Sequence, residues 1–338
     1  MSPKTILITW WTGYIWSHAV VAFEQAGYKT VIIDNLTYSS KDVLLWIEAI
    51  LWYMPTFYEM DISDKKRLGE LFEKYGFDGV VHFAWFKSPN ESCKNPFLYH
   101  ENNIVWSIHL FEVMQKHNVK NIIFSSSAAI YDAENISPIN EQGKVGTANA
   151  YGTTKAVLEM LLQDYAKFSH WKVLSLRYFN PIWAHSSWEI GEKLAEVPPN
   201  ILPYLYKVAL KQIPFVKIFW NDYGTPDGTG LRDYVDVNDL VEAHIVAFEK
   251  LQSSDKTHLY ENINIGTGRA TSVLELIQIV EKVTWEQIPF EFHERRLWDL
   301  WIAYADVDFS KKYLEWESKT DIETSIKNGW NFLKKKLH

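Results

Sequence analysis

Tyr151 and Lys155 are two side chains whose types and spacing suggest proton chemistry. They stand four residues apart in Tyr151-Gly152-Thr153-Thr154-Lys155, so a helix would place both on one face. A tyrosine with an ordinary pKa of about 10 can act as a base near neutral pH only if a nearby positive charge stabilises its phenolate, and Lys155 can supply that charge. The alternative is an ordinary pair on the surface of a helix.

A run of serines supplies a possible third member of this group. Ser125-Ser126-Ser127 follows an apolar segment that reads as a buried strand. A serine hydroxyl at the end of that strand can bridge a substrate oxygen and the phenol of Tyr151. A strand-ending serine run together with the Tyr-x-x-x-Lys spacing is far more specific than either pattern alone.

The elements that must position these residues alternate between strand and helix. Short apolar runs at residues 6–9, 30–33, 79–83 and 121–125 predict buried strands, and residues 172–177 predict the sixth strand. Segments that begin at residues 14, 64 and 97 have helical spacing, and residues 150–168 predict the longest helix of this half. The alternation predicts an α/β fold of the Rossmann type, with a doubly wound parallel sheet.

The second half of the chain is less regular. After about residue 181, loops that contain proline and glycine separate probable helices at 201–211, 237–251 and 272–283. We therefore predict a Rossmann domain over residues 1–180. Residues 181–338 would form a smaller mixed α/β substrate region, with parts near 231–265 returning to the Rossmann sheet.

A nucleotide site is predicted where the first strand meets the first helix. The segment at residues 9–18 contains Gly13, and Asp34 ends the second strand about 20 residues later, where an acid can bind an adenosine ribose. A negative charge at that position favours NAD over NADP. The alternative is that Asp34 caps the turn that follows.

Composition narrows the function classes. The chain has 338 residues, of which 47% are hydrophobic and 22% charged, so it is not disordered. A formal net charge of −8 argues against a broad basic surface, and we predict neither nucleic-acid nor membrane binding. No apolar run is long enough to span a bilayer. The single cysteine, Cys93, excludes an internal disulfide and a cysteine-ligated zinc site; we predict no metal site and a reducing cytoplasmic location.

Taken together, the sequence resembles the extended short-chain dehydrogenase/reductase superfamily and, within it, the UDP-glucose 4-epimerases (UDP-galactose 4-epimerases). The resemblance extends over nearly the whole chain, and the segment Asp227-Gly228-Thr229-Gly230-Leu231-Arg232-Asp233-Tyr234 is particularly characteristic. The other matching stretches are residues 8–18, 34–36, 82–84, 102–103, 124–131, 150–155, 177–181 and 295–299.

The resemblance assigns roles to individual residues. Tyr151 would be the catalytic base, Lys155 the partner that lowers its pKa and binds ribose, and Ser127 the hydroxyl that helps to move the proton. The positions expected around NAD are Gly13, Tyr14, Ile15, Asp34, Asn35, Asp61, Ile62, Phe83, Ala84, Lys87, Asn103, Ser125, Tyr151, Lys155, Tyr178 and Phe179. The positions expected around the UDP-sugar are Ser127, Tyr151, Asn180, Asn200, Arg232, Arg296 and Asp299.

The implied reaction is a reversible oxidation at the sugar C4 that interconverts UDP-galactose and UDP-glucose. Tyr151 would take the proton of the 4-hydroxyl while hydride passes to NAD, and the keto sugar would turn before hydride returns. Ala303 stands where the family often gates the sugar 2-substituent, and its small side chain leaves room for N-acetylated UDP-hexoses. The resemblance also implies a homodimer through the helices at 97–117 and 150–168.

Two other readings remain open at this stage. One is another nucleotide-sugar enzyme of the superfamily, but a dehydratase needs an acid pair after the strand-five hydroxyl, and Ala128-Ala129-Ile130 follows Ser127. The other is a member of the same fold that binds nucleotide without catalysis.

The sequence departs from the family at its glycines. Restoring the nine family glycine positions that hold tryptophan would raise the 15 glycines to about 24, the number that average usage predicts. Indole rings in the phosphate loop would fill space that the pyrophosphate requires, so we predict that this chain binds NAD weakly and has reduced activity. The nine positions are Trp10, Trp11, Trp16, Trp85, Trp106, Trp183, Trp188, Trp220 and Trp298, and Tyr38 replaces a small polar residue near the adenosine.

Overall fold

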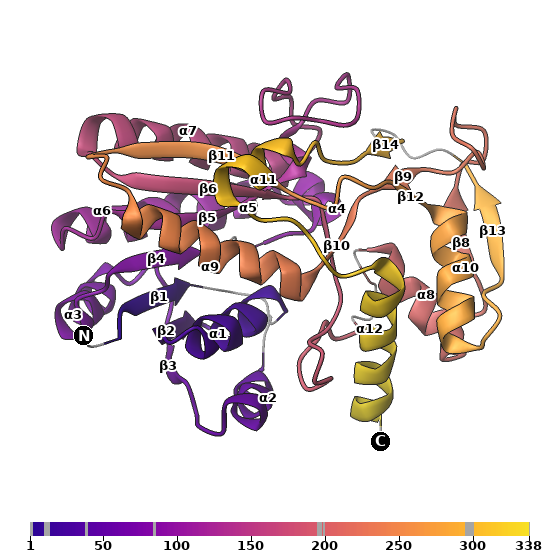
Figure 1. Ribbon diagram of the computed structural model, residues 1–338, viewed down its shortest axis with the longest axis horizontal. Coiled ribbons are helices and arrows are strands. Elements are labelled where there is room, and N and C mark those ends of the chain that lie inside the picture. The colour runs from indigo at the N-terminus through magenta and orange to yellow at the C-terminus, as the bar shows by residue number, and fades with distance from the viewer. Residues whose placement is uncertain are drawn as a thin grey trace.

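Seven short strands form one parallel sheet in the computed structural model (Figure 1). The structure describes residues 3–9, 14–37, 40–83, 86–194, 198, 200–294 and 301–337. The sheet has the order β11-β6-β5-β4-β1-β2-β3. Its strands are β1 (Thr5–Thr9), β2 (Lys29–Asp34), β3 (Thr56–Glu59), β4 (Gly79–His82), β5 (Asn121–Ser127), β6 (Lys172–Tyr178) and β11 (Leu259–Ile265).

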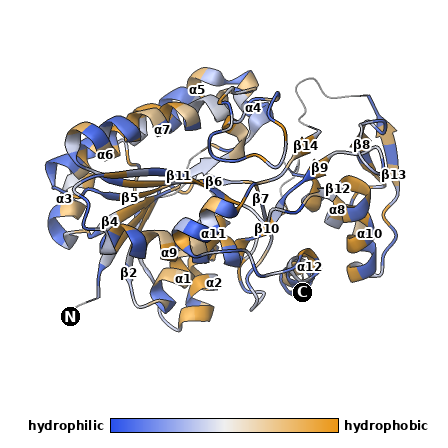
Figure 2. Ribbon diagram, turned by 45° about the horizontal axis from the view of Figure 1, so that its top comes forward, coloured by the Kyte–Doolittle hydropathy of each residue, from blue (hydrophilic) through white to orange (hydrophobic). Residues whose placement is uncertain are grey.

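The central strands are apolar because helices cover both faces of the sheet. Ile6, Leu7 and Ile8 of β1 have no exposed surface, as expected for a parallel strand between two helical layers. One core lies between the sheet and α1 (Ile15–Gln25), α2 (Asp42–Leu51), α9 (Val237–Ser253) and α11 (Asp308–Leu314). The opposite core includes α3 (Lys65–Tyr75), α6 (Trp106–Lys116) and α7 (Ala150–Ser169). Figure 2 shows the hydrophobic strands between helices that carry both polar and apolar residues.

The strand order reverses between β1 and β4. From β1 the chain continues to β2 and β3 on one side, and β4, β5 and β6 then extend the sheet on the other side. A crevice for a ligand is expected outside the carboxyl ends of the strands at such a reversal. Thr9, Asp34, Ser127 and Tyr178 are the last residues of their strands and therefore border this edge.

A smaller region lies beyond this edge of the sheet (Figure 1). Its core is formed mainly by α8 (Ile201–Ala209), α10 (Val273–Thr284), α12 (Ile322–Leu337) and β8 (Val216–Phe219), which pairs with β13 (Phe290–His293). Its other strands are β7 (Asn180–Ile182), β9 (Leu231–Arg232), β10 (Tyr234–Asp236), β12 (Thr271–Ser272) and β14 (Ile302–Ala303).

The predicted fold class is confirmed: the chain forms a doubly wound parallel α/β sheet. The sequence patterns did not delimit strands at β3 and β11, although parts near 231–265 were expected to return to the sheet. Strand β11 pairs in parallel with β6, so the chain does return to the sheet after forming part of the smaller region. Among the described residues, no helix is both long and apolar enough to cross a membrane.

Candidate active site at the carboxyl edge of the sheet

Helix α7 begins beside the carboxyl end of β5. Asn149 caps this helix, and its side-chain oxygen accepts a hydrogen bond from the backbone N–H of Gly152 at 2.8 Å. A Cβ on Gly152 would lie 2.5 Å from the carbonyl oxygen of Ala129 in η2 (Ala128–Ile130), the 3₁₀ turn that follows β5. Glycine at position 152 therefore allows the helix to approach the strand end closely.

The three predicted catalytic residues meet at this point. The side chains of Tyr151 and Ser127 are hydrogen-bonded. The Ser127 hydroxyl oxygen also accepts from the Ala129 N–H at 3.1 Å, so its proton is available for the Tyr151 oxygen. Lys155 Nζ lies 5.7 Å from the centre of the Tyr151 ring and donates to the carbonyl of Ser125. The arrangement can exchange a proton between the phenol and a substrate hydroxyl.

Burial opposes the charged forms of both Tyr151 and Lys155. It raises the pKa of Tyr151 to about 12, although the hydrogen bond to Ser127 acts in the other direction. It lowers the pKa of Lys155 to about 7, against the opposing charge of Glu159. The expected lowering of the Tyr151 pKa by Lys155 is therefore not found here, because the buried amine is itself a poor cation and is directed to the Ser125 carbonyl.

A buried histidine fixes two residues predicted around NAD. His244 Nδ1 lies 2.8 Å from the Leu240 carbonyl, which can only accept, so Nδ1 carries the proton and Nε2 accepts from the Tyr178 hydroxyl. Burial lowers the pKa of His244 to about 4, which keeps the imidazole neutral. Phe83 stacks on the same ring with centroids 5.2 Å apart. Tyr178 and Phe83 thus share one neutral support on α9.

Asn103 clamps the segment after β4 to helix α7. It lies in η1 (Glu101–Val105), a π-helical turn. Its side-chain oxygen accepts from the Phe86 N–H at 3.1 Å, and its amide group donates to the Phe86 carbonyl at 3.0 Å and to Thr154 Oγ1 at 3.2 Å. The predicted cofactor residue is therefore placed at this edge by contacts within the protein.

Lys87, one residue after Phe86, points toward the beginning of α1. Its Nζ lies 3.3 Å from Glu192 Oε1 and 5.7 Å from the centre of the Tyr14 ring. An amine at a helix N-terminus in this fold can pair with a phosphate group.

Four residues predicted around NAD, among them Asp34 for the adenosine ribose, lie at or just after the ends of β2 and β3. Asp34 is 1% exposed, and its Oδ1 accepts from the Leu36 N–H at 2.6 Å, so this oxygen caps the turn as the alternative reading expected. Asn35 donates to Asp61 Oδ2 at 2.8 Å, and Ile62 is buried beside them. These four predicted residues thus lie at the end of β2 and in the segments that directly follow β2 and β3.

The beginning of α1 contains predicted cofactor residues and Trp16, where the resemblance predicts a glycine. Tyr14 precedes the helix and Ile15 is its first residue. Trp16 and His18 are each 1% exposed. Tyr14 Oη, Trp16 Nε1 and His18 Nε2 are buried, and each lacks a hydrogen-bond partner among the described residues. A buried polar group without a partner costs about 1–3 kcal/mol, so this helix start is less well satisfied than the start of α7.

Asn180 and Arg232, two of the predicted substrate residues, lie on neighbouring segments. The Asn180 N–H donates to the Asp233 carbonyl at 3.0 Å, which places Asn180 beside the strand that contains Arg232. Arg232 pairs in register with Ala303 of β14. Asn200 is exposed at the N-cap of α8, and no described contact joins it to the other two. Phe179, predicted near the cofactor, is buried and donates its N–H to Ile265.

Asp233 organises this side of the site, although sequence analysis gave it no role of its own. Its buried carboxylate accepts from the Thr267 N–H and hydroxyl, from the Gly268 N–H and from the Ala305 N–H, at 2.7–3.1 Å. The carboxylate therefore holds the segments around 267 and 305 beside Arg232. Its place inside the characteristic 227–234 motif was the available signal.

Several predicted positions lie outside the described residues. They are Gly13, Ala84, Arg296 and Asp299 of the predicted site, Trp10, Trp11, Trp85 and Trp298 of the glycine positions, and Tyr38. Their roles stay predictions.

Some tryptophans outside α1 have left-handed backbone, whereas Trp106, another of the nine positions, has a right-handed φ of −72°. Trp188 and Trp220, two of the nine positions, have φ angles of 61° and 77°. Trp52 and Trp285, which sequence analysis did not single out, have φ angles of 66° and 61° at the ends of α2 and α10. Left-handed backbone is the region in which glycine is favoured over residues with a Cβ. Trp183, a further position, is fully buried against Tyr206 with centroids 4.9 Å apart.

Comparisons with known proteins identify the family of the chain. The family model described as "NAD dependent epimerase/dehydratase family" matches residues 6–266. A UDP-glucose 4-epimerase of Bacillus subtilis is 40% identical over 328 residues, which cover 97% of this chain and 96% of that protein. A UDP-glucose 4-epimerase of Neisseria gonorrhoeae is 42% identical over 332 residues, 97% of each chain.

A solved structure extends the likeness to three dimensions. The UDP-glucose 4-epimerase of Stenotrophomonas maltophila, with bound NAD and formylated UDP-arabinopyranose, superposes with a TM-score of 0.95 at 37% identity and covers 99% of each chain. The fold, the length of the match and the identity together show that the chain belongs to the NAD-dependent epimerase/dehydratase family.

Proposed function

We propose that this protein is a UDP-glucose 4-epimerase that interconverts UDP-galactose and UDP-glucose by transient oxidation at the sugar C4. The observation that carries the proposal is the meeting of Tyr151, Ser127 and Lys155 at the carboxyl edge of the sheet. Identity of about 40% to UDP-glucose 4-epimerases over nearly the whole chain supports the same substrate.

The residues at this edge fit NAD as the cofactor. Asp34, Asn35 and Asp61 offer oxygens where an adenosine ribose would lie, Lys87 offers a cation near the start of α1, and the Tyr178 and Phe83 rings border the nicotinamide end. Bound NAD would accept hydride from the sugar and return it. In this proposal residues 1–180 hold mainly the cofactor, and residues 181–338 hold mainly the UDP-sugar.

The protein's own contribution to the reaction is proton transfer and orientation. Tyr151 takes the proton of the sugar 4-hydroxyl, directly or through the Ser127 hydroxyl, and gives it back when the reaction reverses. Because burial raises the Tyr151 pKa, the phenolate needs a positive charge nearby, and Lys155 is the side chain that can provide one.

The diphosphate and sugar would be held on the smaller region. Arg232 and Asn180 lie beside one another there, and a guanidinium matches phosphate oxygens in geometry and charge. Asn200, Arg296 and Asp299 remain predicted contacts from sequence. Ala303, the register partner of Arg232, is positioned to affect the size of the 2-substituent that enters.

Incubation of the purified protein with UDP-galactose, with and without added NAD, tests the proposal. We expect UDP-glucose to form, and chromatography of the nucleotide sugars detects it. NAD content is measured on the same sample after denaturation. Absence of UDP-glucose with saturating NAD present would contradict the proposal.

We also propose that the protein forms a homodimer through α7 and the helices at 97–117. Phe97, Val105, Met160 and Phe168 are large apolar side chains exposed on α5 (Pro96–His100), η1 and α7, and α5 packs against α7. Sedimentation of the protein and of a Phe97→Glu/Met160→Glu variant tests this, with a dimer expected for the first and a monomer for the second.

The single cysteine, Cys93, supports a cytoplasmic location.

A further inference from the structure

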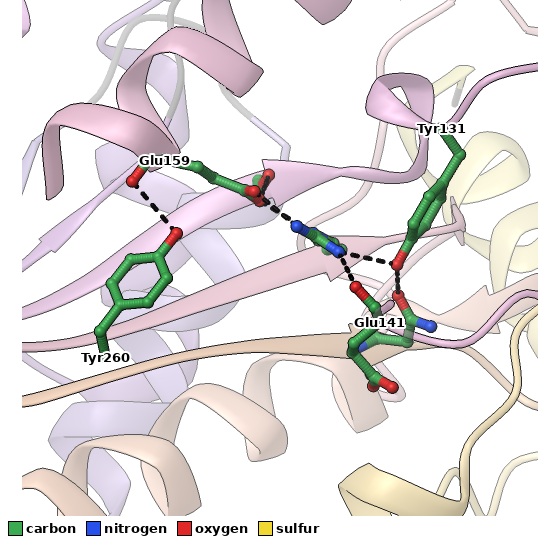
Figure 3. Close-up of polar contacts among 7 residues, drawn as sticks. Tyr131, Glu141, Glu159 and Tyr260 are labelled. Carbon is green, nitrogen blue, oxygen red and sulfur yellow. Dashed lines mark hydrogen bonds and ion pairs between the residues drawn. The ribbon is translucent and has the colours of Figure 1, made fainter. Parts of the chain in front are cut away.

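A buried ion pair between Glu159 and Arg177 joins β6 to α7, the helix that carries the proposed catalytic lysine. Figure 3 shows Glu159 within the network of polar contacts around this pair. Glu159 is one helical turn after Lys155 on α7 and is 5% exposed. Its carboxylate accepts from Arg177 Nε at 2.9 Å, from Arg177 Nη2 at 2.7 Å and from the Ser126 hydroxyl at 2.6 Å. Arg177, in β6, is 3% exposed. The pair is bidentate and satisfied, which is the geometry a buried charge pair requires.

The remaining donors of Arg177 tie this pair to the segment that follows β5. Nη1 donates to Tyr131 Oη at 3.0 Å and to the Glu141 carbonyl at 2.9 Å. Because an arginine has no acceptor, the Tyr131 oxygen accepts from it and the Tyr131 proton goes to Asn264 Oδ1 at 2.6 Å. Tyr260 donates to the backbone carbonyl of Glu159 at 3.1 Å. One network thus joins β5, α7, β6, β11 and the residues between η2 and α7.

Three successive serines of β5 each contact a different residue of α7. The Ser125 carbonyl receives Lys155, the Ser126 hydroxyl binds Glu159, and the Ser127 hydroxyl binds Tyr151. A shift of α7 along β5 would disturb all three contacts together. Because the ion pair between Glu159 and Arg177 joins α7 to β6, it helps to fix the position of Tyr151 and Lys155 relative to the end of β5.

The charges around Lys155 come from few groups. On its own helix these are Tyr151 and Glu159; from β4, the buried His82 faces it, and burial lowers the pKa of His82 to about 3, so that histidine is neutral. From β5 it meets the Ser125 carbonyl and the Phe124 ring, 4.9 Å from its Nζ. Glu159 is the anion that acts on Lys155, and Arg177 is the cation bound to that anion.

We propose that Glu159, held in place by Arg177, is a positioning residue of the active site that keeps Lys155 protonated and aligned with Tyr151. This inference rests on the proposed function, because Lys155 is there the charged partner of the base. Within the described part of the chain, neither Glu159 nor Arg177 forms a hydrogen bond with Tyr151 or Ser127, so both would act through Lys155 and the position of α7.

The sign of the electrostatic effect follows from the geometry. Glu159→Gln keeps the size of the side chain but removes the negative charge and leaves Arg177 uncompensated, so the Lys155 pKa falls further below about 7. Arg177→Gln removes the positive charge and leaves the carboxylate, so the Lys155 pKa rises. If the ion pair had only a structural role, the two variants would not shift the Lys155 pKa in opposite directions.

The first experiment needs neither substrate nor cofactor. Urea unfolding of the protein and of Glu159→Gln is measured at pH 6 and at pH 9. An unfolded lysine has a pKa of about 10.4, so between pH 6 and pH 9 the unfolded chain keeps a proton that folded Lys155 loses. At pH 6 folded Lys155 of the unaltered protein binds its proton, but in the variant the uncompensated charge of Arg177 weakens the binding of that proton and so lowers the stability of the folded state. At pH 9 folded Lys155 is neutral in both proteins, so this difference disappears. We therefore expect Glu159→Gln to lower the unfolding free energy less at pH 9 than at pH 6.

Tyr260→Phe is the matched control for this measurement. It removes a hydrogen bond to the same residue of the same helix without changing charge. We expect its loss of stability to be equal at the two pH values. An equal loss at pH 6 and pH 9 for Glu159→Gln as well would overturn the proposal.

The second experiment follows kcat against pH with NAD at saturation. Activity falls where Lys155 loses its proton, so Glu159→Gln should move this alkaline fall to lower pH by about one unit, and Arg177→Gln should move it to higher pH. KM for UDP-galactose should change less than kcat. Unchanged profiles in both variants, or the same shift in Tyr260→Phe, would overturn the proposal. If Glu159→Gln is insoluble, the direction of the Arg177→Gln shift decides. If the unaltered protein has no epimerase activity, the proposed function fails, and the unfolding experiment still decides this inference.

Discussion

The starts of two helices, α7 and α1, face the same edge of the sheet but differ in how well their surroundings fit them. At α7, Asn149 caps the helix, Gly152 allows close approach, and Tyr151 and Lys155 both have hydrogen-bond partners. At α1, three buried polar atoms lack partners among the described residues, and the buried Trp16 stands where the resemblance predicts a glycine. The residues proposed to transfer protons thus have partners, while the residues predicted near the cofactor phosphates include polar atoms without one among the described residues. We therefore expect mutations at the two helix starts to separate catalysis from cofactor binding.

The largest effect is expected from Tyr151→Phe, which removes the proposed base from the intact region. Loss of a positioned general base lowers kcat by about 10²–10⁴-fold. NAD content after denaturation should stay the same, because the phenyl ring keeps its packing. Epimerase assays and the nucleotide measurement on one preparation check both parts. Activity within twofold of the unaltered protein would remove Tyr151 from the mechanism.

The converse change restores glycine in the altered region. We expect the triple variant Trp10→Gly/Trp11→Gly/Trp16→Gly to bind NAD at least about tenfold more tightly, because overpacking typically costs about 1–3 kcal/mol and 1.4 kcal/mol is a factor of ten. Titration with NAD followed by protein fluorescence or calorimetry measures the change. Trp171→Phe, in the opposite core beside Phe111 and Tyr165, is the control for loss of an indole away from the site. One equivalent of tightly bound NAD in the unaltered protein would show that the tryptophans do not block the site.

The contact between α7 and η2 can be tested by Gly152→Ala. The added Cβ would lie 2.5 Å from a backbone oxygen, so the helix start must move, at a cost of about 1–3 kcal/mol in unfolding free energy. Urea unfolding measures this cost, and kcat should fall as well because Tyr151 moves with the helix. Gly69→Ala, inside α3 and with the nearest atom to a Cβ 3.6 Å away, should leave kcat unchanged and raise the unfolding free energy by roughly 0.5–1 kcal/mol, because alanine is the better helix former. Equal results for the two variants would mean that the close approach at Gly152 is not needed.

The sequence predicted the parts of the site that depend on local spacing. Tyr151, Lys155 and the serines converge because a helix repeat and the common edge of parallel strands bring them together. The contact of Arg177 with Glu159 was missed because it joins a strand to a helix, and no local pattern marks a charged residue inside a buried strand as paired.

The missed strands have a similar explanation. In β11 the apolar run is interrupted by Glu261, Asn262 and Asn264, and Asn264 is buried only because it bonds Tyr131 and the Ile139 carbonyl. For Asp34 the sequence left turn capping and ribose binding open. The structure shows the capping bond to Leu36 for one oxygen, and ribose binding stays a prediction.

The smallest expected effect comes from replacing two exposed tryptophans that lie in left-handed backbone away from the proposed site. Trp52 and Trp285 have left-handed φ angles and are 90% and 92% exposed, so their indoles contribute little packing. A residue with a Cβ pays roughly 1–2 kcal/mol in this conformation, part of which glycine loses again through its greater freedom in the unfolded chain. Trp52→Gly and Trp285→Gly should therefore each raise the unfolding free energy by about 1 kcal/mol or less, with no change in NAD binding. Trp52→Ala, which keeps the Cβ, should give no gain in urea unfolding. A gain from alanine equal to that from glycine would assign the effect to the exposed indole and not to the left-handed backbone.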